Sequence, residues 1–423
     1  MKPIDVAIAG AGVAGLAAAI LLTRLGARVS VFERFQASAP VGSGLMIQPT
    51  GLAALETLGL RGELESLGAR LTRLHGRTVA GAPIFNVSYA DLAPDAYALG
   101  VHRAALHGVL WRAFAASGAA FEGGATVCAT TPAADGRIAA TGENGRALGV
   151  FDLVVDASGA RSALRAQVDA APARPFANGA VWASVPDTGL DPTALSQRYV
   201  AAHTMIGHLP IGRTAPDGPV QAAFFWSLKP AGHAAWRAGF EAWRDRVSQA
   251  WPELAPTVQA LSGPDALTLA EYRHFTARRP HASRLVLIGD SAHATSPQLG
   301  QGANNGLLDA CALAAALASH ADIDTALADY ARVRRANVRF YQRASALMTP
   351  FFQSDSILLA TVRDLAFDRL RLVPWLRREM VRTLAGLKTG PFSSAPVDRL
   401  ASRARLQAAL MDAAGRDHAV LLG

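Results

Sequence analysis

Lysine is almost absent from this 423-residue chain and occurs only at Lys2, Lys229 and Lys388. The formal net charge of +8 is therefore carried by arginine. These arginines are scattered along the chain and form no basic block, so the sequence does not indicate a nucleic-acid-binding surface. Hydrophobic residues make up 51% of the chain, enough for a large core in two or three domains or in one interleaved unit.

Cysteine is also scarce. Cys128 and Cys311 are the only two, and neither belongs to a Cys-x-x-Cys pair or to a spacing typical of metal ligands. We therefore expect reduced thiols and no metal site. The longest apolar run, residues 4–22, is interrupted by Asp5 and by glycines. It fits a strand, turn and helix better than a signal peptide or membrane span, so we expect a cytoplasmic protein without a membrane-spanning segment.

The first motif that indicates a function is GAGVAG at residues 10–15. A strand over 4–9 and a helix over 13–25 flank it, and a second strand over 28–32 ends at an acid. In a dinucleotide-binding turn, the first glycine permits the tight turn, the second admits the pyrophosphate and the third lets helix and strand pack closely. The acid is placed to bind ribose hydroxyls. The residues expected to form this part of the site are Gly10, Gly12, Ala14, Gly15, Glu33 and Arg34.

A second glycine-rich motif lies near the middle of the C-terminal half. Residues 284–288 read as a buried strand, followed by GDSAHATSPQLGQGANNG at 289–306 and a long alanine-rich helix over 303–319. Free amides at such a helix start, together with the positive end of its dipole, favour a group that carries negative charge.

This stretch resembles the second FAD motif of the class A flavoprotein aromatic hydroxylases, the p-hydroxybenzoate hydroxylase-like family. The matching positions are Gly289, Asp290, Ala292, His293, Pro297, Gly300, Gln301, Gly302, Asn304, Gly306, Asp309 and Ala310. The resemblance implies that Asp290 binds the ribityl chain of FAD and that the 297–302 loop lies along the isoalloxazine ring. Backbone amides of Gly302, Ala303 and Asn304 would face the pyrimidine edge of the ring, while His293 would be structural.

Three further segments resemble parts of the same family. DASGARSALR at 156–165 is similar to a motif with roles in FAD and NAD(P)H binding. Ser158 stands where the family has aspartate, and an aspartate occurs two residues earlier. VGSGLMIQPTGLAAL at 41–55 is similar to a segment beside the flavin ring, and a helix over 101–117 carries an arginine that reaches FAD. The cofactor-binding residues expected here are Gly44, Arg103, Asp156, Gly159 and Arg161.

The resemblance implies an α/β fold: a Rossmann-type FAD-binding domain with an interleaved β-sheet substrate domain and a helical C-terminal region. We expect residues 1–70, 100–170 and 280–345 in the first, 71–99 and 171–279 in the second and 346–423 in the third. Alternating runs such as HTMIGHLPIG and QAAFFWSL predict strands of the substrate sheet. The substrate-pocket candidates are His208, Phe224, Trp226 and Pro297, and a proline such as Pro350 predicts a break between C-terminal helices.

The implied function is a single-component FAD-dependent monooxygenase that hydroxylates a small aromatic substrate with O2 through a C4a-hydroperoxyflavin. A second GxGxxG motif is lacking, in agreement with transient binding of NADH or NADPH as reductant, which a mildly positive surface would attract. Alternatives of the same fold are an FAD-dependent reductase or an oxidative cyclase; a halogenase is disfavoured by the lack of WxWxIP. A non-catalytic flavoprotein is the remaining alternative. The sequence assigns no catalytic acid or base, and leaves monomer and homodimer open.

Overall fold

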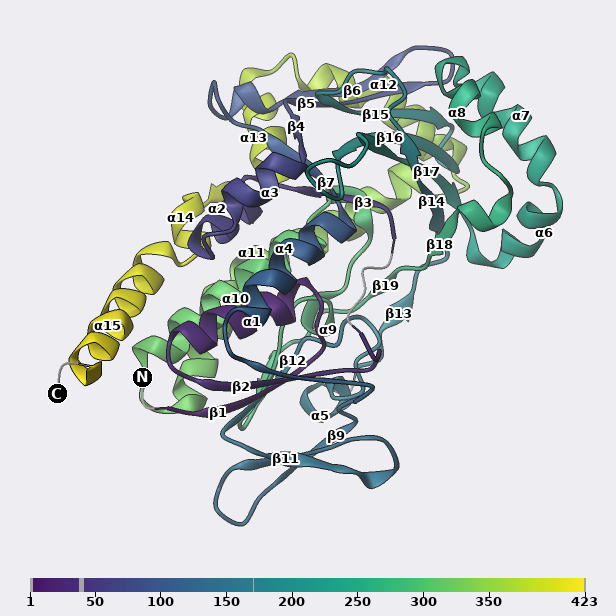
Figure 1. The fold of residues 1–423 in the computed structure, drawn as a ribbon. Coiled ribbons are helices and arrows are strands. Elements are labelled where there is room, and N and C mark those ends of the chain that lie inside the picture. Colours follow the sequence, from purple (N-terminus) through teal and green to yellow (C-terminus); the bar gives the residue numbers. More distant parts are fainter. Residues whose placement is uncertain (1–2, 38–41, 170, 422–423) are drawn as a thin grey trace.

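Two large β-sheets, bridged by long helices, organise the molecule (Figure 1). The computed structural model describes residues 3–37, 42–169 and 171–421. Its mixed α/β architecture confirms the predicted fold class. Within the described residues, no helix is long and apolar enough to cross a membrane.

The first sheet has six strands, and all of its pairings are parallel except that of the edge strand β20. Its strands, in spatial order, are β20 (His281–Ala282), β21 (Leu285–Leu287), β12 (Leu153–Asp156), β1 (Asp5–Ala9), β2 (Arg28–Glu33) and β8 (Ala120–Gly123). Ala9 pairs with Asp156, and Asp156 pairs with Leu287. The carboxyl ends of β1, β12 and β21 are therefore aligned, and the three glycine-rich motifs leave the sheet side by side.

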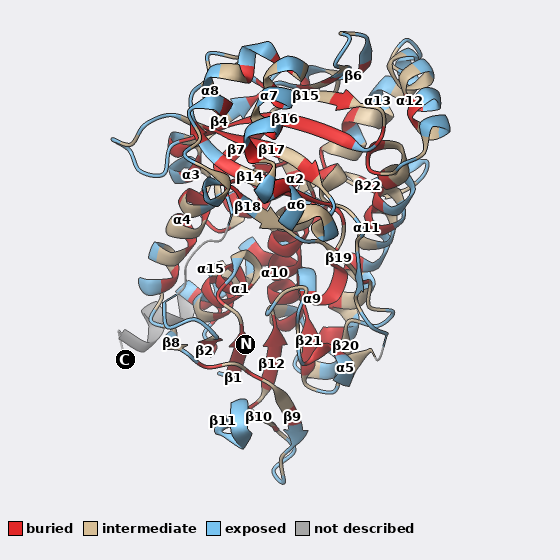
Figure 2. Cartoon of the chain, turned by 90° about the vertical axis from the view of Figure 1, so that its right-hand side faces the viewer, coloured by how far each residue is buried: buried red, intermediate tan, exposed pale blue. Residues whose placement is uncertain are grey.

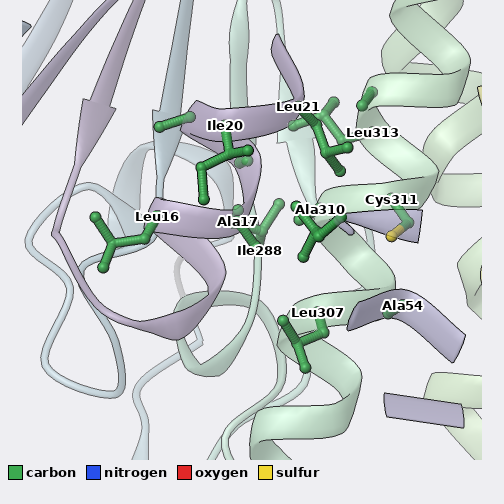
Figure 3. Close-up of a cluster of buried hydrophobic side chains, with 14 of the residues drawn as sticks. Leu16, Ala17, Ile20, Leu21, Ala54, Ile288, Leu307, Ala310, Cys311 and Leu313 are labelled. Atoms are coloured by element: carbon green, nitrogen blue, oxygen red, sulfur yellow. The ribbon is translucent and has the colours of Figure 1, made fainter. Parts of the chain in front are cut away.

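Helices α1 (Val13–Arg24) and α10 (Gly302–Ser319) pack against each other next to this sheet (Figure 3). Leu16, Ile20 and Leu21 of α1 meet Leu307 and Leu313 of α10 in the same buried cluster. The many alanines between them allow a close helix approach, and burial of the leucine and isoleucine side chains stabilises it by roughly 2 kcal/mol each. This packing holds the starts of both helices at the same edge of the sheet.

The second sheet has seven strands and lies beyond the first, over the N-terminal end of α10 (Figures 1 and 2). In spatial order they are β18 (Thr268–Ala270), β14 (Gly179–Pro186), β17 (Gln221–Leu228), β16 (Thr204–Gly212), β15 (Ala194–Val200), β5 (Arg73–Thr78) and β6 (Pro83–Ser88). Helices α6 (His233–Ala238), α7 (Phe240–Ala250) and α8 (Ala255–Gln259) cover its outer face.

Smaller elements join these layers. A three-stranded sheet of β3 (Gly44–Ile47), β7 (Ala98–His102) and β4 (Ala69–Leu71) lies between the two large sheets. The other short strands are β9 (Ala129–Pro132), β10 (Ile138–Thr141), β11 (Ala147–Phe151), β13 (Arg174–Pro175), β19 (Arg273–His274), β22 (Lys388–Gly390) and β23 (Ser393–Ser394). The other helices before residue 300 are α2 (Pro49–Thr57), α3 (Arg61–Leu67), α4 (Arg103–Ala115), α5 (Arg165–Val168) and α9 (Asp290–His293).

The C-terminal region is mainly helical. Its helices are α11 (Ile323–Phe352), α12 (Ile357–Leu370), α13 (Pro374–Leu384), α14 (Val397–Leu400) and α15 (Arg403–Leu421). Pro350 lies in the last turn of α11, which ends at Phe352, and the break expected near this proline follows before α12 begins at Ile357. The expected boundary at 345/346 also falls inside α11, so this helix continues from the region of the glycine motifs into the C-terminal cap.

Candidate functional site

The turn after β1 is closed by two glycines whose missing side chains the fold requires. Gly10 has a φ of +102°, and a Cβ there would lie 2.7 Å from the Ala157 carbonyl oxygen. A Cβ on Gly15 would lie 2.0 Å from the Gly10 carbonyl oxygen. Gly12 differs, since a Cβ there would meet no atom within 4 Å and the residue lines a large cavity. Gly10 and Gly15 therefore shape the turn, and Gly12 leaves its backbone open to a ligand.

The other N-terminal candidates lie around this turn. Ala14 lines the cavity, and its Cβ lies 3.1 Å from where a Cβ of Gly306 would stand, so it fixes the spacing of α1 and α10. Glu33 ends β2 and its Oε2 accepts a hydrogen bond of 2.9 Å from the Ala11 amide. Arg34 is exposed and its guanidinium lies over the Phe35 ring. The expected contact of Glu33 with a ribose, and the expected cofactor contact of Arg34, stay predictions.

The middle motif contains a hydrogen-bonded turn built on Asp156. Its Oδ1 accepts from the Ser158 amide at 3.0 Å and from Ser158 Oγ at 2.5 Å, and its Oδ2 accepts from Ser162 Oγ. Asp156 is fully buried and is not among the residues that line the cavity, so its carboxylate holds the turn together, and its expected contact with the cofactor stays a prediction. The departure at Ser158 has a physical reason, because an aspartate there would place a second carboxylate against Asp156.

Two other residues of this motif reach the cavity directly. Gly159 and Arg161 both line it, and Arg161 forms an ion pair of 3.2 Å with Glu271. Arg165 lies behind them and donates to the carbonyl oxygens of Ser291 and Gly159. The arginine thereby ties the middle motif to the turn that follows β21.

Asp290, at the start of α9, presents a carboxylate to the cavity. Its side chain is accessible from the cavity. Protein atoms packed around the carboxyl group disfavour its charged form, and this raises its pKa despite the nearby positive charges. Its carboxylate accepts no side-chain or backbone hydrogen bond within the described residues. An accessible carboxylate without a hydrogen-bond donor is suited to bind the hydroxyl groups of a sugar alcohol.

The start of α10 provides backbone donors to the same cavity. The first hydrogen bond of the helix runs from the Asn305 amide to the Gln301 carbonyl oxygen. The preceding amides, those of Gly302, Ala303 and Asn304, therefore have no acceptor within the helix. Gly302 and Ala303 line the cavity, as do Gly300 and Pro297. The Asn304 side chain instead accepts from the Gln48 amide at 2.8 Å and donates to the Met46 carbonyl oxygen at 3.2 Å. Its side chain therefore fixes the 46–48 segment, and the residue is fully buried.

Arg103 and Gly44 complete this side of the cavity. Arg103 begins α4, is exposed and lines the cavity, and its amide donates to the Ser43 carbonyl oxygen. A Cβ on Gly44 would lie 2.4 Å from a methyl group of Ile211, so the glycine allows β3 to approach the seven-stranded sheet. The structure thus brings residues from widely separated segments to one cavity, namely Gly12, Ala14, Gly44, Arg103, Gly159, Arg161, Asp290, Pro297, Gly300, Gly302 and Ala303.

The cavity has a volume of about 1540 Å³ and continues from the glycine motifs to the inner face of the seven-stranded sheet. This exceeds the usual 300–1,000 Å³ of a site for one small molecule, so there is room for two ligands. We call its sheet-lined part the apolar chamber. The strand residues that line it are Leu74, Phe85, Val87, Ala180, Trp182, Leu195, Gln197, Tyr199, Met205, Leu209, Phe225, Thr268, Leu269 and Ala270.

Three of the four substrate-pocket candidates lie on the face of this sheet that is turned away from the cavity. Phe224 and Trp226 pack against Trp243 of α7, at centroid distances of 6.1 and 6.0 Å, in the cluster under the outer helices. His208 is also buried away from the cavity, and its Nε2 lies 2.8 Å from Thr188 Oγ1. The neighbour Phe225 faces the chamber and stacks on Trp182. Side chains alternate along a strand, so Phe224 and Trp226 share one face and Phe225 lies on the other. The face that carries Phe225 is the one that lines the cavity.

Known proteins share this arrangement. Residues 3–344 match the family model of the FAD binding domain. The chain belongs to the family of FAD-dependent aromatic hydroxylases. It is similar to 3-amino-4-hydroxybenzoate 2-monooxygenase of Streptomyces cremeus, with 32% identity over 75% of this chain and 79% of the relative. Aurachin C monooxygenase/isomerase of Stigmatella aurantiaca is 29% identical over 79% of this chain and 86% of its own length.

A solved structure has the same fold. The crystal structure of Klebsiella pneumoniae HpxO complexed with FAD and uric acid superposes with a TM-score of 0.77, at 22% identity, over 92% of this chain and 98% of that one. The matching family model is that of an FAD binding domain, so FAD is the cofactor, and the residues here fit it. Gly12 leaves open space at the turn, Asp290 offers a free carboxylate and α10 offers free amides.

Several lining residues were missed by the sequence interpretation. Helix α11 lines the cavity with a face that runs from Ala336 through Arg339 and Arg343 to Met348, and α13 contributes Glu379 and Met380. Tyr272, from the loop after β18, also lines it. The three- and four-residue spacing along α11 indicates only an amphipathic helix, since the sequence does not say which element covers its apolar side.

Proposed function

We propose that this protein is a single-component FAD-dependent monooxygenase that hydroxylates a small aromatic compound with O2 and NADH or NADPH. One observation carries the proposal: a single cavity joins the three FAD-type turns to a water-poor chamber lined by apolar strand residues. A hydroxylase of this kind requires both ligands in one enclosed space. The aromatic ring named for the similar Streptomyces cremeus enzyme supports an aromatic substrate.

When bound, FAD would supply the redox chemistry, accepting a hydride from the nicotinamide and activating O2. Gly12 and the start of α1 would bind its pyrophosphate, and Asp290 its ribityl hydroxyls. The amides of Gly302 and Ala303, which line the cavity, would stabilise negative charge on the reduced ring. Arg103 and Arg161 line the same region and add positive charge near it.

The rest of the chain would position the substrate and exclude water. Phe225 and Trp182 form a stacked pair at a centroid distance of 4.4 Å in the chamber wall, and Pro297 borders the passage toward the cofactor turns. These side chains offer flat apolar surfaces for an aromatic ring. No acid or base is assigned, since orientation and dehydration are what these residues provide.

The reductant is proposed to bind transiently at the mouth of the cavity, because the sequence carries a single GxGxxG motif. We propose that residues 1–70, 100–170 and 280–345 form the FAD-binding domain and that 71–99 and 171–279 form the substrate domain, a division supported by the two large sheets. Residues 346–423 would form the helical third region. We further propose a cytoplasmic monomer or homodimer.

The decisive experiment is oxygen labelling. Protein purified with FAD is mixed with NADH or NADPH and a panel of phenols, quinolones and pyridines under ¹⁸O2, and products are analysed by mass spectrometry. Substrate-stimulated NAD(P)H oxidation with one labelled oxygen in the product supports the monooxygenase. A reduced or cyclised product without label would instead identify the reductase or oxidative cyclase of the same fold.

A further inference from the structure

The seven-stranded sheet keeps its charged side chains away from the cavity. Its strands contain only three arginine, lysine, aspartate or glutamate residues, namely Arg73, Arg77 and Arg198. All three alternate with cavity-lining positions and therefore face the opposite side. Arg198, for example, lies over the Trp251 ring on the outer face. The strands thus present a wholly uncharged surface to the apolar chamber.

The C-terminal helices extend this uncharged surface. Met348 and Phe352 of α11, Phe367 of α12 and Met380 of α13 line the same cavity and pack with the sheet residues in one cluster. Charged lining residues lie outside the strands. They stand at the FAD-type turns, at Glu271 directly after β18, where it pairs with Arg161, and along α11, α13 and β22, where Lys388 pairs with Glu379. The chamber is therefore long as well as apolar, and no charged side chain comes from its sheet wall.

Tyr272 supplies a specific polar group at the edge of the chamber. Its hydroxyl oxygen accepts a hydrogen bond of 3.2 Å from Trp182 Nε1, and within the described residues its own proton is donated to no acceptor. Trp182 is held in turn by stacking on Phe225. Arg103, at the start of α4, lines the same cavity as Tyr272. The phenol can therefore donate to a ligand oxygen.

We propose that the substrate is a neutral, elongated apolar aromatic compound and that an oxygen atom attached to its ring accepts a hydrogen bond from the Tyr272 hydroxyl group. This inference rests on the proposed function and names the substrate class of the same site. A carboxylate seated against the sheet would lose its hydration without a cation from the strands, which is unfavourable. The cations that line the cavity, such as Arg339 and Arg343, stand on other elements. An alkyl group or a second ring would instead displace water from the Met205, Phe352 and Met380 side chains.

A ligand series on the FAD-loaded protein tests this class. 4-Methyl-, 4-propyl-, 4-pentyl- and 4-heptylphenol are titrated at pH 7 while the flavin absorbance is followed, with 4-hydroxybenzoate as the anionic ligand of the same ring. Affinity should rise about two- to fourfold for each methylene that becomes buried, and 4-heptylphenol should bind at least tenfold more tightly than 4-hydroxybenzoate. Equal or tighter binding of 4-hydroxybenzoate, or no dependence on chain length, would overturn the proposal.

A substitution tests the hydrogen bond separately. Tyr272→Phe should lower the affinity for 4-heptylphenol about tenfold. The affinity for heptylbenzene, which lacks an oxygen, should stay within about twofold of the wild-type value. Equal losses for both ligands would show that Tyr272 only shapes the wall and would refute its role as donor. Retention of FAD and of NAD(P)H oxidation by the wild-type protein reports on the proposed function independently, so its failure and that of the substrate class are distinguishable.

Discussion

His293 Nε2 lies 2.5 Å from Asp309 Oδ2, and the same carboxylate oxygen accepts a hydrogen bond of 2.8 Å from the Gly289 amide. Arg334 Nε binds the other oxygen of Asp309 at 2.6 Å. All four residues are buried. The His293–Asp309 pair therefore anchors the turn that presents Asp290 to the cavity. His293 thus has a structural role next to this turn, as the family resemblance implied.

Replacement of Asp309 by asparagine should strongly destabilise the protein. Arg334 would be left buried without its anion, a change that typically costs about 3–5 kcal/mol. The free energy of unfolding in urea measures this cost, and FAD retention should fall because the 289–290 turn loses its anchor. Asp355→Asn is the matched control, since its ion pair with Lys229 is exposed and should contribute less than about 1 kcal/mol. Equal effects of the two substitutions would contradict this role.

The same carboxylate makes a contribution to stability that acid removes. Burial acts to raise the pKa of Asp309, but His293 and Arg334 outweigh it and hold the pKa at about 2. Because the folded pKa lies below the unfolded value of about 3.9, the contribution is complete above about pH 4 and is lost as pH falls toward 2. The difference in unfolding free energy between wild type and Asp309→Asn should therefore shrink from pH 5 to pH 3. A difference independent of pH would exclude this linkage.

Two glycines of one motif should respond in opposite ways to alanine. Gly12→Ala adds a methyl group that meets no protein atom within 4 Å, so unfolding should change by less than about 1 kcal/mol. FAD affinity should fall at least tenfold, because the methyl group occupies the approach to the pyrophosphate. Gly15→Ala would force a Cβ to 2.0 Å from the Gly10 carbonyl oxygen and should cost about 1–3 kcal/mol of stability. Thermal unfolding of the apoproteins and FAD titration separate the two effects.

Asp290→Asn should weaken cofactor binding while stabilising the apoprotein. Loss of a charged acceptor for FAD hydroxyls should reduce affinity about 10- to 100-fold. Burial raises the carboxyl pKa of Asp290, so the folded state is penalised for ionising this group once pH exceeds the unfolded value. At pH 8 the apo variant should therefore have a higher Tm than wild type, and the gain should vanish below about pH 4. A lower Tm at pH 8 would show that the carboxylate has a structural partner.

The sequence predicts the FAD side of the site better than the substrate side, for physical reasons. The three turns could be placed together because each glycine motif follows a buried strand, and parallel strands end at one edge. The buried roles of Asp156 and the Asn304 side chain depend on partners at Ser162 and Gln48, which sequence spacing does not reveal. The run QAAFFWSL is apolar on both faces of its sheet, so its pattern contains no signal for which face is the chamber.

Because Phe224 and Phe225 face opposite sides of the sheet, substitutions at these two adjacent residues should have different effects. Phe224 lies under the outer helices against Trp243. Phe224→Leu should therefore lower the free energy of unfolding by about 1–2 kcal/mol without changing ligand affinity. Phe225→Leu removes the ring that stacks on Trp182 in the chamber wall. It should raise the KM for the aromatic substrate about tenfold, since an aromatic contact and its burial are lost together. Urea unfolding and substrate-stimulated NAD(P)H oxidation measure both quantities. If Phe224→Leu shifted KM and Phe225→Leu did not, the chamber would lie on the other face of the sheet.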